Sequence, residues 1–111
     1  MNEFTDYLHE VFELFGPITI RRMFDGYTVY HQGIPVGIVY DETLFLKADA
    51  ETRKHFESLE LPQFTYQKKE KTIGLPYFQA PDFVLEDRHK AALWMRRAYE
   101  AGLRSKPKNK R

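Results

Sequence analysis

The most constraining feature of the sequence is a change in the spacing of its apolar residues after Pro17. From residue 18 to residue 47, apolar and polar side chains alternate with a period of two, which is typical of β-strands with one buried face. Three turn-forming segments interrupt the alternation: Asp25-Gly26, Gln32-Gly33 and Asp41-Glu42-Thr43. Asp-Gly is preferred in tight hairpin turns because both residues tolerate positive φ. The region therefore predicts four consecutive antiparallel strands, a meander.

Helices are predicted on either side of this meander and near the end of the chain. Before Gly16-Pro17, five apolar residues recur at helical spacing: Phe4, Leu8, Val11, Phe12 and Phe15. Residues 49–61 predict a short middle helix with Asp49 as its N-cap. Asp87 is expected to cap a final helix from residue 88 to about 103. This helix has an apolar stripe formed by Ala91, Trp94, Met95, Ala98 and Ala101.

Two shorter strands are predicted at residues 64–67 and 75–79, with the charged residues 68–74 as a loop between them. Pro76 indicates an edge or irregular position, because proline cannot donate to a β-ladder. A chain of 111 residues is long enough for one core but hardly for two. The sequence therefore predicts one α+β domain, residues 1–103, in which an antiparallel sheet packs against an N-terminal, a middle and a C-terminal helix.

The composition excludes several classes of protein. Hydrophobic residues make up 42% and aromatic residues 15% of the chain, which is typical of a packed globule and not of a disordered segment. The absence of cysteine excludes disulfides, thiolate metal sites and cysteine nucleophiles. The sequence shows no signal peptide, and no apolar run approaches the roughly 20 residues of a membrane-spanning helix. We therefore expect a cytoplasmic protein without a membrane partner.

Positive charge is concentrated at the C-terminal end of the chain. Five of the 17 Lys and Arg residues lie in the last eight positions, so the preceding residues carry 12 positive and 16 negative charges. Residues 104–111 are therefore predicted to form a flexible basic tail on a slightly acidic body. The candidates for nucleic-acid contact are Arg96, Arg97, Arg104, Lys106, Lys108, Lys110 and Arg111. So few basic residues support only weak, sequence-independent and salt-sensitive binding to phosphate.

Aromatic residues are more numerous than three helices can cover. They are Tyr27, Tyr30, Tyr40, Phe45, Phe64, Tyr66, Tyr77 and Phe78. Exposed apolar surface of this kind usually marks a partner site. Two explanations remain open: either loops or the chain ends cover this surface, or the chain forms a homodimer. The candidate partner contacts are Arg21, Tyr27, Tyr30, Tyr77 and Phe78.

Two adjacent arginines, Arg21 and Arg22, lie inside the first predicted strand. Because successive side chains of a strand point to opposite faces, the two cannot both lie on a solvated face. Alternation places Arg22 on the apolar face with Ile20, where a guanidinium needs an acceptor. We predict a structural ion pair between Arg22 and Glu86 or Asp87. Arg21 is then the better candidate for contact with a partner.

The sequence contains no motif for catalysis, metal binding or cofactor binding. Its four histidines, His9, His31, His55 and His89, fall on different predicted elements without metal-ligand spacing. Neither serine lies in a nucleophile motif, and the six glycines are dispersed instead of forming a phosphate-binding loop. We therefore predict no catalytic residues, no cofactor, no metal site and no enzyme activity.

Several short motifs together resemble the N-terminal domain of the TfoX/Sxy family of competence regulators. They are Arg-Arg-Met-Phe followed by a glycine turn, Leu-Lys-Ala-Asp at the entry to a helix, Phe-Thr-Tyr, and a Glu-Asp step before a helix that contains tryptophan. The resemblance covers nearly the whole chain. It implies a helix-flanked antiparallel sheet, no enzyme activity and gene regulation through protein partners, in some members with the cyclic-AMP receptor protein at competence promoters.

The sequence departs from the family pattern at two positions. Asp25 stands where members commonly have the first of two glycines, and Phe78 stands where an aromatic residue, often Trp, follows Tyr77. Members of the two-domain type continue into a C-terminal helical domain, so this chain resembles a stand-alone N-terminal domain. The resemblance implies a regulatory binding module whose partner is the transcription machinery or a transcription factor. Weak DNA binding by the tail and the last helix is the alternative.

Overall fold

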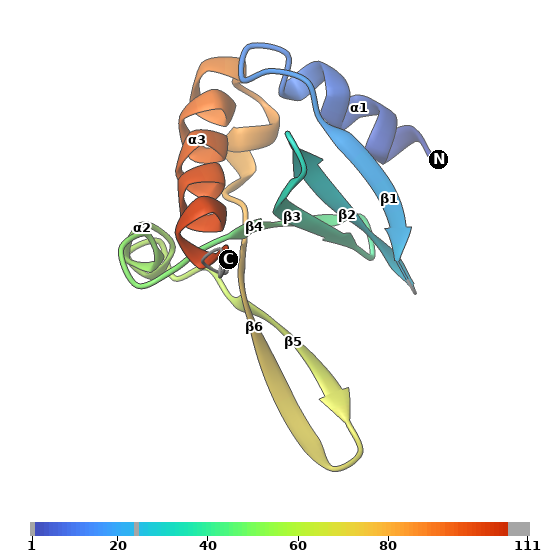
Figure 1. Ribbon diagram of the computed structural model, residues 1–111, viewed down its shortest axis with the longest axis vertical. Helices are drawn as coiled ribbons and strands as arrows, with labels where there is room; N and C mark the ends of the chain where they lie inside the picture. The colour runs from blue at the N-terminus through green and yellow to red at the C-terminus, as the bar shows by residue number, and fades with distance from the viewer. Residues whose placement is uncertain (1, 24, 107–111) are drawn as a thin grey trace, which may run out of the picture.

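A six-stranded antiparallel sheet forms the centre of the structure (Figure 1). The computed structural model describes residues 2–23 and 25–106. The strands are β1 (Thr19–Met23), β2 (Gly26–His31), β3 (Ile34–Tyr40), β4 (Thr43–Lys47), β5 (Gln63–Lys68) and β6 (Lys71–Gln79). Their order in the sheet is β1-β2-β3-β4-β6-β5, and every neighbouring pair is antiparallel. The predicted meander and the α+β fold class are confirmed.

The described helices are α1 (Glu3–Val11), α2 (Arg53–Glu57), the 3₁₀ helix η1 (Asp82–Leu85) and α3 (Arg88–Ser105). Asn2 caps α1, because its side chain accepts a hydrogen bond from the Thr5 N–H while the Thr5 hydroxyl accepts one from the Asn2 N–H. Asp87 caps α3 as predicted and accepts from the N–H groups of His89 and Lys90. These two hydrogen bonds lower the pKa of Asp87.

The prediction that Asp49 caps the middle helix is wrong. Helix α2 begins only at Arg53, and no side chain caps it. The Asp49 carboxylate instead accepts hydrogen bonds from the N–H groups of Glu51 and Thr52 and from the Thr52 hydroxyl. Aspartate bonds to N–H groups two or three residues ahead in turns as well as in helices, so the same residue signal serves both.

The prediction of a loop at residues 68–74 is also wrong. The ladder between β5 and β6 continues to the pair Lys68 and Lys71, and only Lys69 and Glu70 form the turn. Lys69 adopts a φ of +58°, the left-handed conformation that closes a two-residue hairpin turn. The charged composition therefore reflects a solvent-exposed hairpin, which projects from the body in Figure 1.

One face of the sheet and the helices enclose a single core. The strands contribute Ile20, Val29, Val39, Leu44, Leu46 and Phe78, and the helices contribute Leu8, Val11, Phe12, Phe56, Trp94, Met95 and Ala98. The Trp94 ring lies 5.1 Å from Phe56 and 5.9 Å from Phe83 between centroids. All five residues of the predicted stripe on α3 are buried. The core therefore joins the long C-terminal helix to the middle of the sheet.

Helix α3 approaches β3 most closely at Gly102. A Cβ atom added there would lie 2.6 Å from Cγ2 of Ile34 and 3.0 Å from the carbonyl oxygen of Pro35. Glycine costs a helix interior about 1 kcal/mol relative to alanine. Glycine suits this position because α3 and β3 are so close here that no side chain fits between them.

None of the helices in the described part of the chain is both long enough and apolar enough to span a membrane. The cytoplasmic location stays a prediction from the sequence.

Removing the Trp94 ring should destabilise the domain strongly. We expect Trp94→Ala to lower the free energy of unfolding by about 3–5 kcal/mol, because it leaves a cavity between α2, α3 and η1. Urea unfolding measures this change. Leu93→Ala is the matched control, since Leu93 is the preceding residue of α3 and is 47% exposed. Equal unfolding midpoints for the two variants would contradict the central place of Trp94 in the core.

Candidate functional site

Side-chain alternation assigns each strand residue to one of two faces of the sheet. The face that carries Val29 and Leu46 packs against the helices. We name the opposite face the open face, because none of its side chains belongs to the core that the described helices cover. The ladder register and the ring contacts place on it Arg21, Tyr30, Ile38, Tyr40, Phe45, Lys47, Phe64, Tyr66, Ile73, Leu75 and Tyr77.

The middle of the open face is buried although it lies outside the core that the described helices cover. Ile38 on β3 is 4% exposed and Tyr77 on β6 is 8% exposed. Burial, with a smaller contribution from Tyr30, raises the pKa of Tyr77. Tyr40, at the end of β3, is 44% exposed and is the most accessible ring of the face outside the hairpin.

Two basic side chains lie over the rings of Tyr30 and Tyr77. The Arg21 guanidinium carbon is 5.9 Å from the centre of the Tyr30 ring, and Lys47 Nζ is 5.1 Å from the centre of the Tyr77 ring. Both distances are within the range of cation–π attraction. Burial lowers the pKa of Lys47, and the charge of Asp49 opposes this shift. The open face thus combines aromatic rings with two positive charges.

A shallow hollow of about 320 Å³ lies at the β1–β2 end of the open face. Thr19, Arg21, Tyr30 and Gly33 line it. Thr19 and Arg21 belong to the edge strand β1, and Gly33 lies in the turn between β2 and β3. The hollow is therefore open to a partner that approaches from this edge of the sheet.

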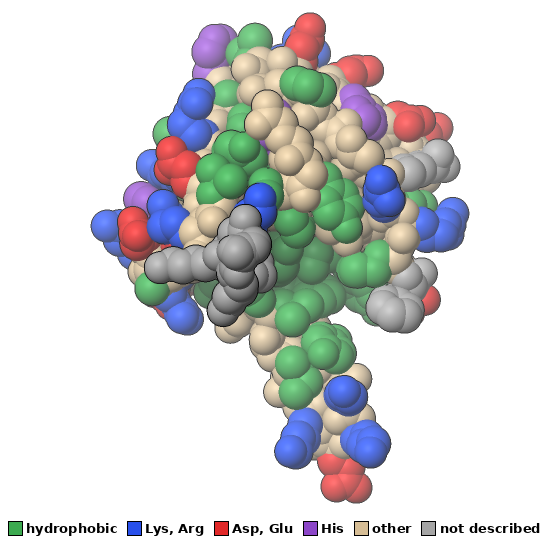
Figure 2. All heavy atoms as spheres, in the orientation of Figure 1, with side chains coloured by type: hydrophobic (Ala, Val, Ile, Leu, Met, Phe, Trp, Pro, Cys, Tyr) green, Lys and Arg blue, Asp and Glu red, His purple; other side chains and the backbone are tan. Residues whose placement is uncertain are grey.

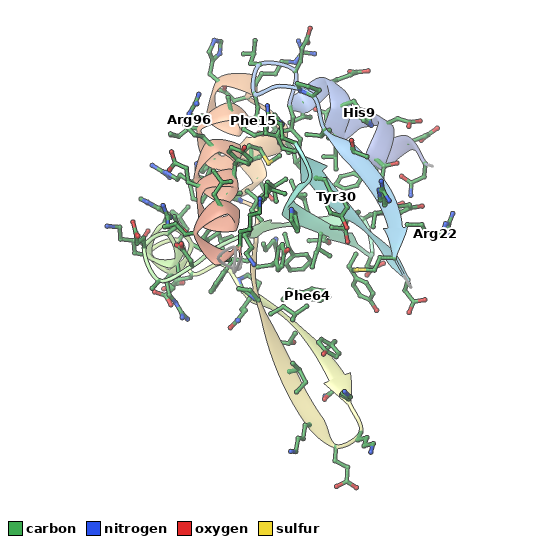
Figure 3. All side chains as sticks on the ribbon, viewed as in Figure 1. His9, Phe15, Arg22, Tyr30, Phe64 and Arg96 are labelled. Carbon is green, nitrogen blue, oxygen red and sulfur yellow. The ribbon has the colours of Figure 1, made fainter. Side chains whose placement is uncertain are left out.

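A cluster of three rings joins the open face to the hairpin. The centroid of Phe64 lies 5.7 Å from Tyr40 and 5.0 Å from Phe45. Figure 3 shows Phe64 at the base of the hairpin and Tyr30 nearer the middle of the molecule. Figure 2 shows hydrophobic side chains in the middle of this view that continue along the hairpin. The open face and the hairpin therefore form one continuous apolar surface.

The structure separates the five predicted partner contacts into two groups. Arg21, Tyr30 and Tyr77 lie together on the open face. Tyr27 packs against the core instead, and Phe78 is buried and stacks on Phe56 at 5.3 Å. Consecutive strand residues point to opposite faces, so Tyr77 and Phe78 cannot both meet one partner. A partner-binding role for the first three residues stays a prediction.

The prediction that Arg22 forms an ion pair with Glu86 or Asp87 is wrong. Arg22 is exposed, and among residues 2–23 and 25–106 neither Glu86 nor Asp87 forms an ion pair with it. Its guanidinium carbon lies 5.6 Å from the ring centre of Tyr27, the residue opposite it on β2. The helices that bury Ile20 therefore do not extend over Arg22 on this edge strand. Side-chain alternation predicted the face on which Arg22 lies, but it could not predict how far along β1 the helices cover that face.

The described nucleic-acid candidates lie along α3 and just beyond its end. Arg96 is exposed on the outer side of the helix (Figure 3), and Lys106 is exposed after the last turn. Arg97 lies over the Trp94 ring at 5.2 Å, and Arg104 is held by carboxylates within the chain. Residues 104 and 105 belong to α3, so the predicted tail begins later than residue 104. Lys108, Lys110 and Arg111 lie outside the described residues.

Arg104 connects the end of α3 to the turn before α2. Its Nε donates to Asp49 Oδ2 at 2.6 Å, and its Nη2 donates to Asp49 Oδ1 at 3.2 Å. Arg104 Nε also lies 3.3 Å from Glu51 Oε2. The hydrogen bond from Arg104, together with those from the Thr52 and Glu51 N–H groups, lowers the pKa of Asp49, although burial acts in the opposite direction. The same ion pair raises the pKa of Arg104.

The histidines lie on four separate elements. His31 is buried on β2, with Nδ1 2.7 Å from the Pro17 carbonyl oxygen, and it contacts the rings of Phe15 and Tyr99. His55 packs beside Trp94, and burial lowers its pKa. In the part of the chain that the structure describes, no three His, Asp or Glu side chains gather as a metal site would require. His31 and His55 therefore both pack against aromatic rings of the same chain.

Sequence reasoning missed four residues of the open face: Ile38, Lys47, Ile73 and Leu75. A signal for the last two was present, because Ile73, Leu75 and Tyr77 recur at every second position. The assignment of Ile73 to a loop obscured this period. Lys47 became visible only through its contact with Tyr77, since the two meet across the β4–β6 ladder.

Comparison with protein families identifies this fold. Residues 10–102, most of the chain, match the family described as the TfoX N-terminal domain. The chain belongs to this family. The TfoX N-terminal domain is a regulatory family that is not known to be catalytic. No curated protein matches the chain. The helix-flanked antiparallel sheet that the resemblance implied is confirmed.

The ion pair between Asp49 and Arg104 should make stability depend on pH. The pKa of Asp49 is lower in the folded protein than the value of about 3.9 expected when unfolded. Its stabilisation is therefore present above that value and is lost as the pH falls through the folded pKa. We expect Asp49→Asn to lower the free energy of unfolding at pH 7 by about 1–2 kcal/mol, with the difference from the original protein shrinking below about pH 4.

Urea unfolding at pH 7 and at about pH 3 measures this effect. Glu10→Gln is the control, because Glu10 is exposed on α1 and has no ion pair among the described contacts. A constant stability difference between Asp49→Asn and the original protein at both pH values would contradict the role of the ionised carboxylate.

Proposed function

We propose that this TfoX N-terminal domain is a non-enzymatic regulatory module that acts through protein–protein contacts, with the open face as its docking surface. The observation that carries the proposal is an apolar sheet face that lies outside the core that the described helices cover. Tyr40 on this face is 44% exposed and lies in a cluster with Phe64 and Phe45. Contiguous apolar surface with polar residues around it is characteristic of interaction sites.

The open face favours a partner of particular chemistry. Aromatic residues and arginine are enriched at protein interfaces, where the rings supply buried area and the guanidinium supplies directed hydrogen bonds. Tyr30 and Arg21 provide this combination beside the hollow at the sheet edge. The partner should therefore present an apolar side chain together with a carboxylate. Membership in a regulatory family supports a component of the transcription machinery or a transcription factor as this partner.

The proposal predicts that regulation depends on the open face. We expect Tyr40→Ala to abolish the effect of the protein on transcript levels, and to reduce recovery of its partner at least about tenfold, because an exposed aromatic anchor is lost. Cells lacking the gene would be complemented with the original protein or a variant, followed by transcript profiling and by affinity capture. Tyr7→Ala is the matched control, since Tyr7 is 43% exposed but lies on α1. Identical transcript profiles for both variants would contradict the proposal.

Direct DNA binding is the second candidate function, and the exposed Arg96 on α3 is the observation that favours it. Arg97 and Arg104 are already engaged within the chain. A DNA-binding surface usually combines a dense basic face with an element that enters a groove. The described part of α3 offers few exposed cations of this kind, so we propose DNA binding only in a weak, sequence-independent form.

A truncation separates the two candidates. We expect the full chain to bind labelled duplex DNA weakly, with an affinity that falls steeply as salt rises, and a chain ending at Lys106 to lose this binding. This end point retains α3 and the ion pair between Arg104 and Asp49. Fluorescence anisotropy at several salt concentrations is the measurement. Tight binding by the shortened chain that Arg96→Gln abolishes would instead establish the folded body as a DNA-contacting regulator.

A further inference from the structure

The outer part of the β5–β6 hairpin, residues 64–75, has features that the fold of one chain does not explain; we name it the arm. Strand β5 lies at the edge of the sheet, and β6 is its only ladder partner in the described structure. Figure 1 shows the hairpin projecting beyond the body. A two-stranded ribbon without a further layer is at best marginally stable in water. The arm therefore lacks the packing that normally holds such a ribbon in place.

The two sides of the arm differ in polarity. One side carries Phe64, Tyr66, Ile73 and Leu75, and the other carries Thr65, Gln67, Thr72 and Gly74. Tyr66 lies among these apolar residues and is 41% exposed. In an antiparallel sheet, this alternation is typical of strands that bury one side against another layer. The apolar side of the arm therefore fits a partner surface.

Charge at the arm tip complements charge elsewhere on the same molecule. The tip, residues 68–71, contains three lysines and one glutamate, a net charge of +2. The β1–β2 and β3–β4 turns carry the exposed acids Asp25, Asp41 and Glu42, a charge of −3. These turns border the end of the sheet where Tyr40 lies. One chain thus presents an apolar arm with a basic tip, and an apolar face with acidic turns at the end where Tyr40 lies and with the cations Arg21 and Lys47 farther from these turns.

We propose that two copies of the chain form a twofold dimer in which each arm lies on the part of the other copy's open face that β1, β2, β3 and β4 form. The apolar side of the arm then covers the exposed rings, and the basic tip meets the acidic turns. A twofold interface requires a surface that is complementary to itself, and both complementary parts are present on this chain. Because each copy supplies one arm and one open face, every contact forms twice, which doubles the area that a single arm buries; specific interfaces typically bury roughly 1,200–2,000 Å².

This inference rests on the proposed function, because it treats the open face as a protein interface, and it names a second copy in place of a transcription component as the occupant. Single-stranded nucleic acid fits the face less well. Tyr77 is only 8% exposed beneath Lys47, so its ring is not available for stacking with a base. The acidic turns beside the face would also repel phosphate. The same turns attract the lysines of a second arm.

Sedimentation velocity of the full chain over a wide concentration range tests the dimer. We expect a concentration-dependent shift toward twice the monomer mass. Tyr66→Glu should weaken dimerisation at least about 30-fold, because it places a charge in the apolar contact. Thr65→Glu is the matched control: it adds the same charge at the adjacent exposed position of β5 but on the other side of the arm, and it should leave the dimer intact.

A charge exchange tests the arrangement of the two copies. We expect Lys68→Glu/Lys71→Glu to be monomeric, because an acidic tip would face acidic turns. Asp41→Lys/Glu42→Lys, which changes the charge of the turns from −3 to +1, should weaken the dimer as well, because the basic tip would then face basic turns. An equimolar mixture of the two variants should recover a heterodimer, since both tip-to-turn contacts are then between opposite charges. Circular dichroism spectra matching the original protein would show that the variants are folded.

Three results would overturn the inference. They are a full chain that remains monomeric at the highest concentrations, equal effects of Tyr66→Glu and Thr65→Glu, and no heterodimer in the charge exchange. Protection of the open face by single-stranded DNA without self-association would also overturn it and identify another occupant. A monomeric protein whose regulation still depends on Tyr40 would contradict the dimer alone. A dimer without any Tyr40-dependent effect on transcripts would contradict the proposed function alone.

Discussion

The period-two alternation of side chains along six strands determines both what this domain buries and what it offers to a partner. In β1, β2, β3, β4 and β6, residues of one face join the core with α1, α2 and α3, and the residues of the other face point away from it. All three helices contribute to one core on one face of the sheet. The burial of apolar side chains against helices therefore takes place on that face. The open face keeps aromatic residues that a soluble sheet would ordinarily replace by polar ones.

Local signals predicted the elements well, and three-dimensional cover explains where they failed. The spacing of apolar residues and the turn dipeptides specified the meander, and the stripe around Trp94 specified α3. The environment of Arg22 depended on where the helical layer ends above an edge strand, which residue spacing does not encode. Asp49 bonds to nearby N–H groups in a turn as it would in a helix, so only the backbone conformation distinguishes the two.

The candidate site was predictable in composition but not in arrangement. The surplus of aromatic residues indicated an uncovered surface, and Arg21, Tyr30 and Tyr77 do lie together on it. Tyr77 and Phe78 were assigned to the same site although adjacent strand residues must point apart. Lys47 and Tyr77 meet across the β4–β6 pairing, which joins segments that residues 48–70 separate in the sequence. Charged residues along the hairpin concealed its β structure, because an exposed ribbon and a polar loop have similar composition.

The close contact at Gly102 and the ion pair of Arg104 lie within one turn of each other at the end of α3. The first prevents the helix from moving closer to β3 or rotating on it, and the second prevents its last turn from lifting away. Together they hold the outer surface of α3 at a constant orientation relative to the sheet. The outer surface of α3 and the open face are therefore two surfaces whose relative position is fixed by one helix end. If each met a different molecule, the domain would set the distance and angle between the two molecules without a change of its own shape.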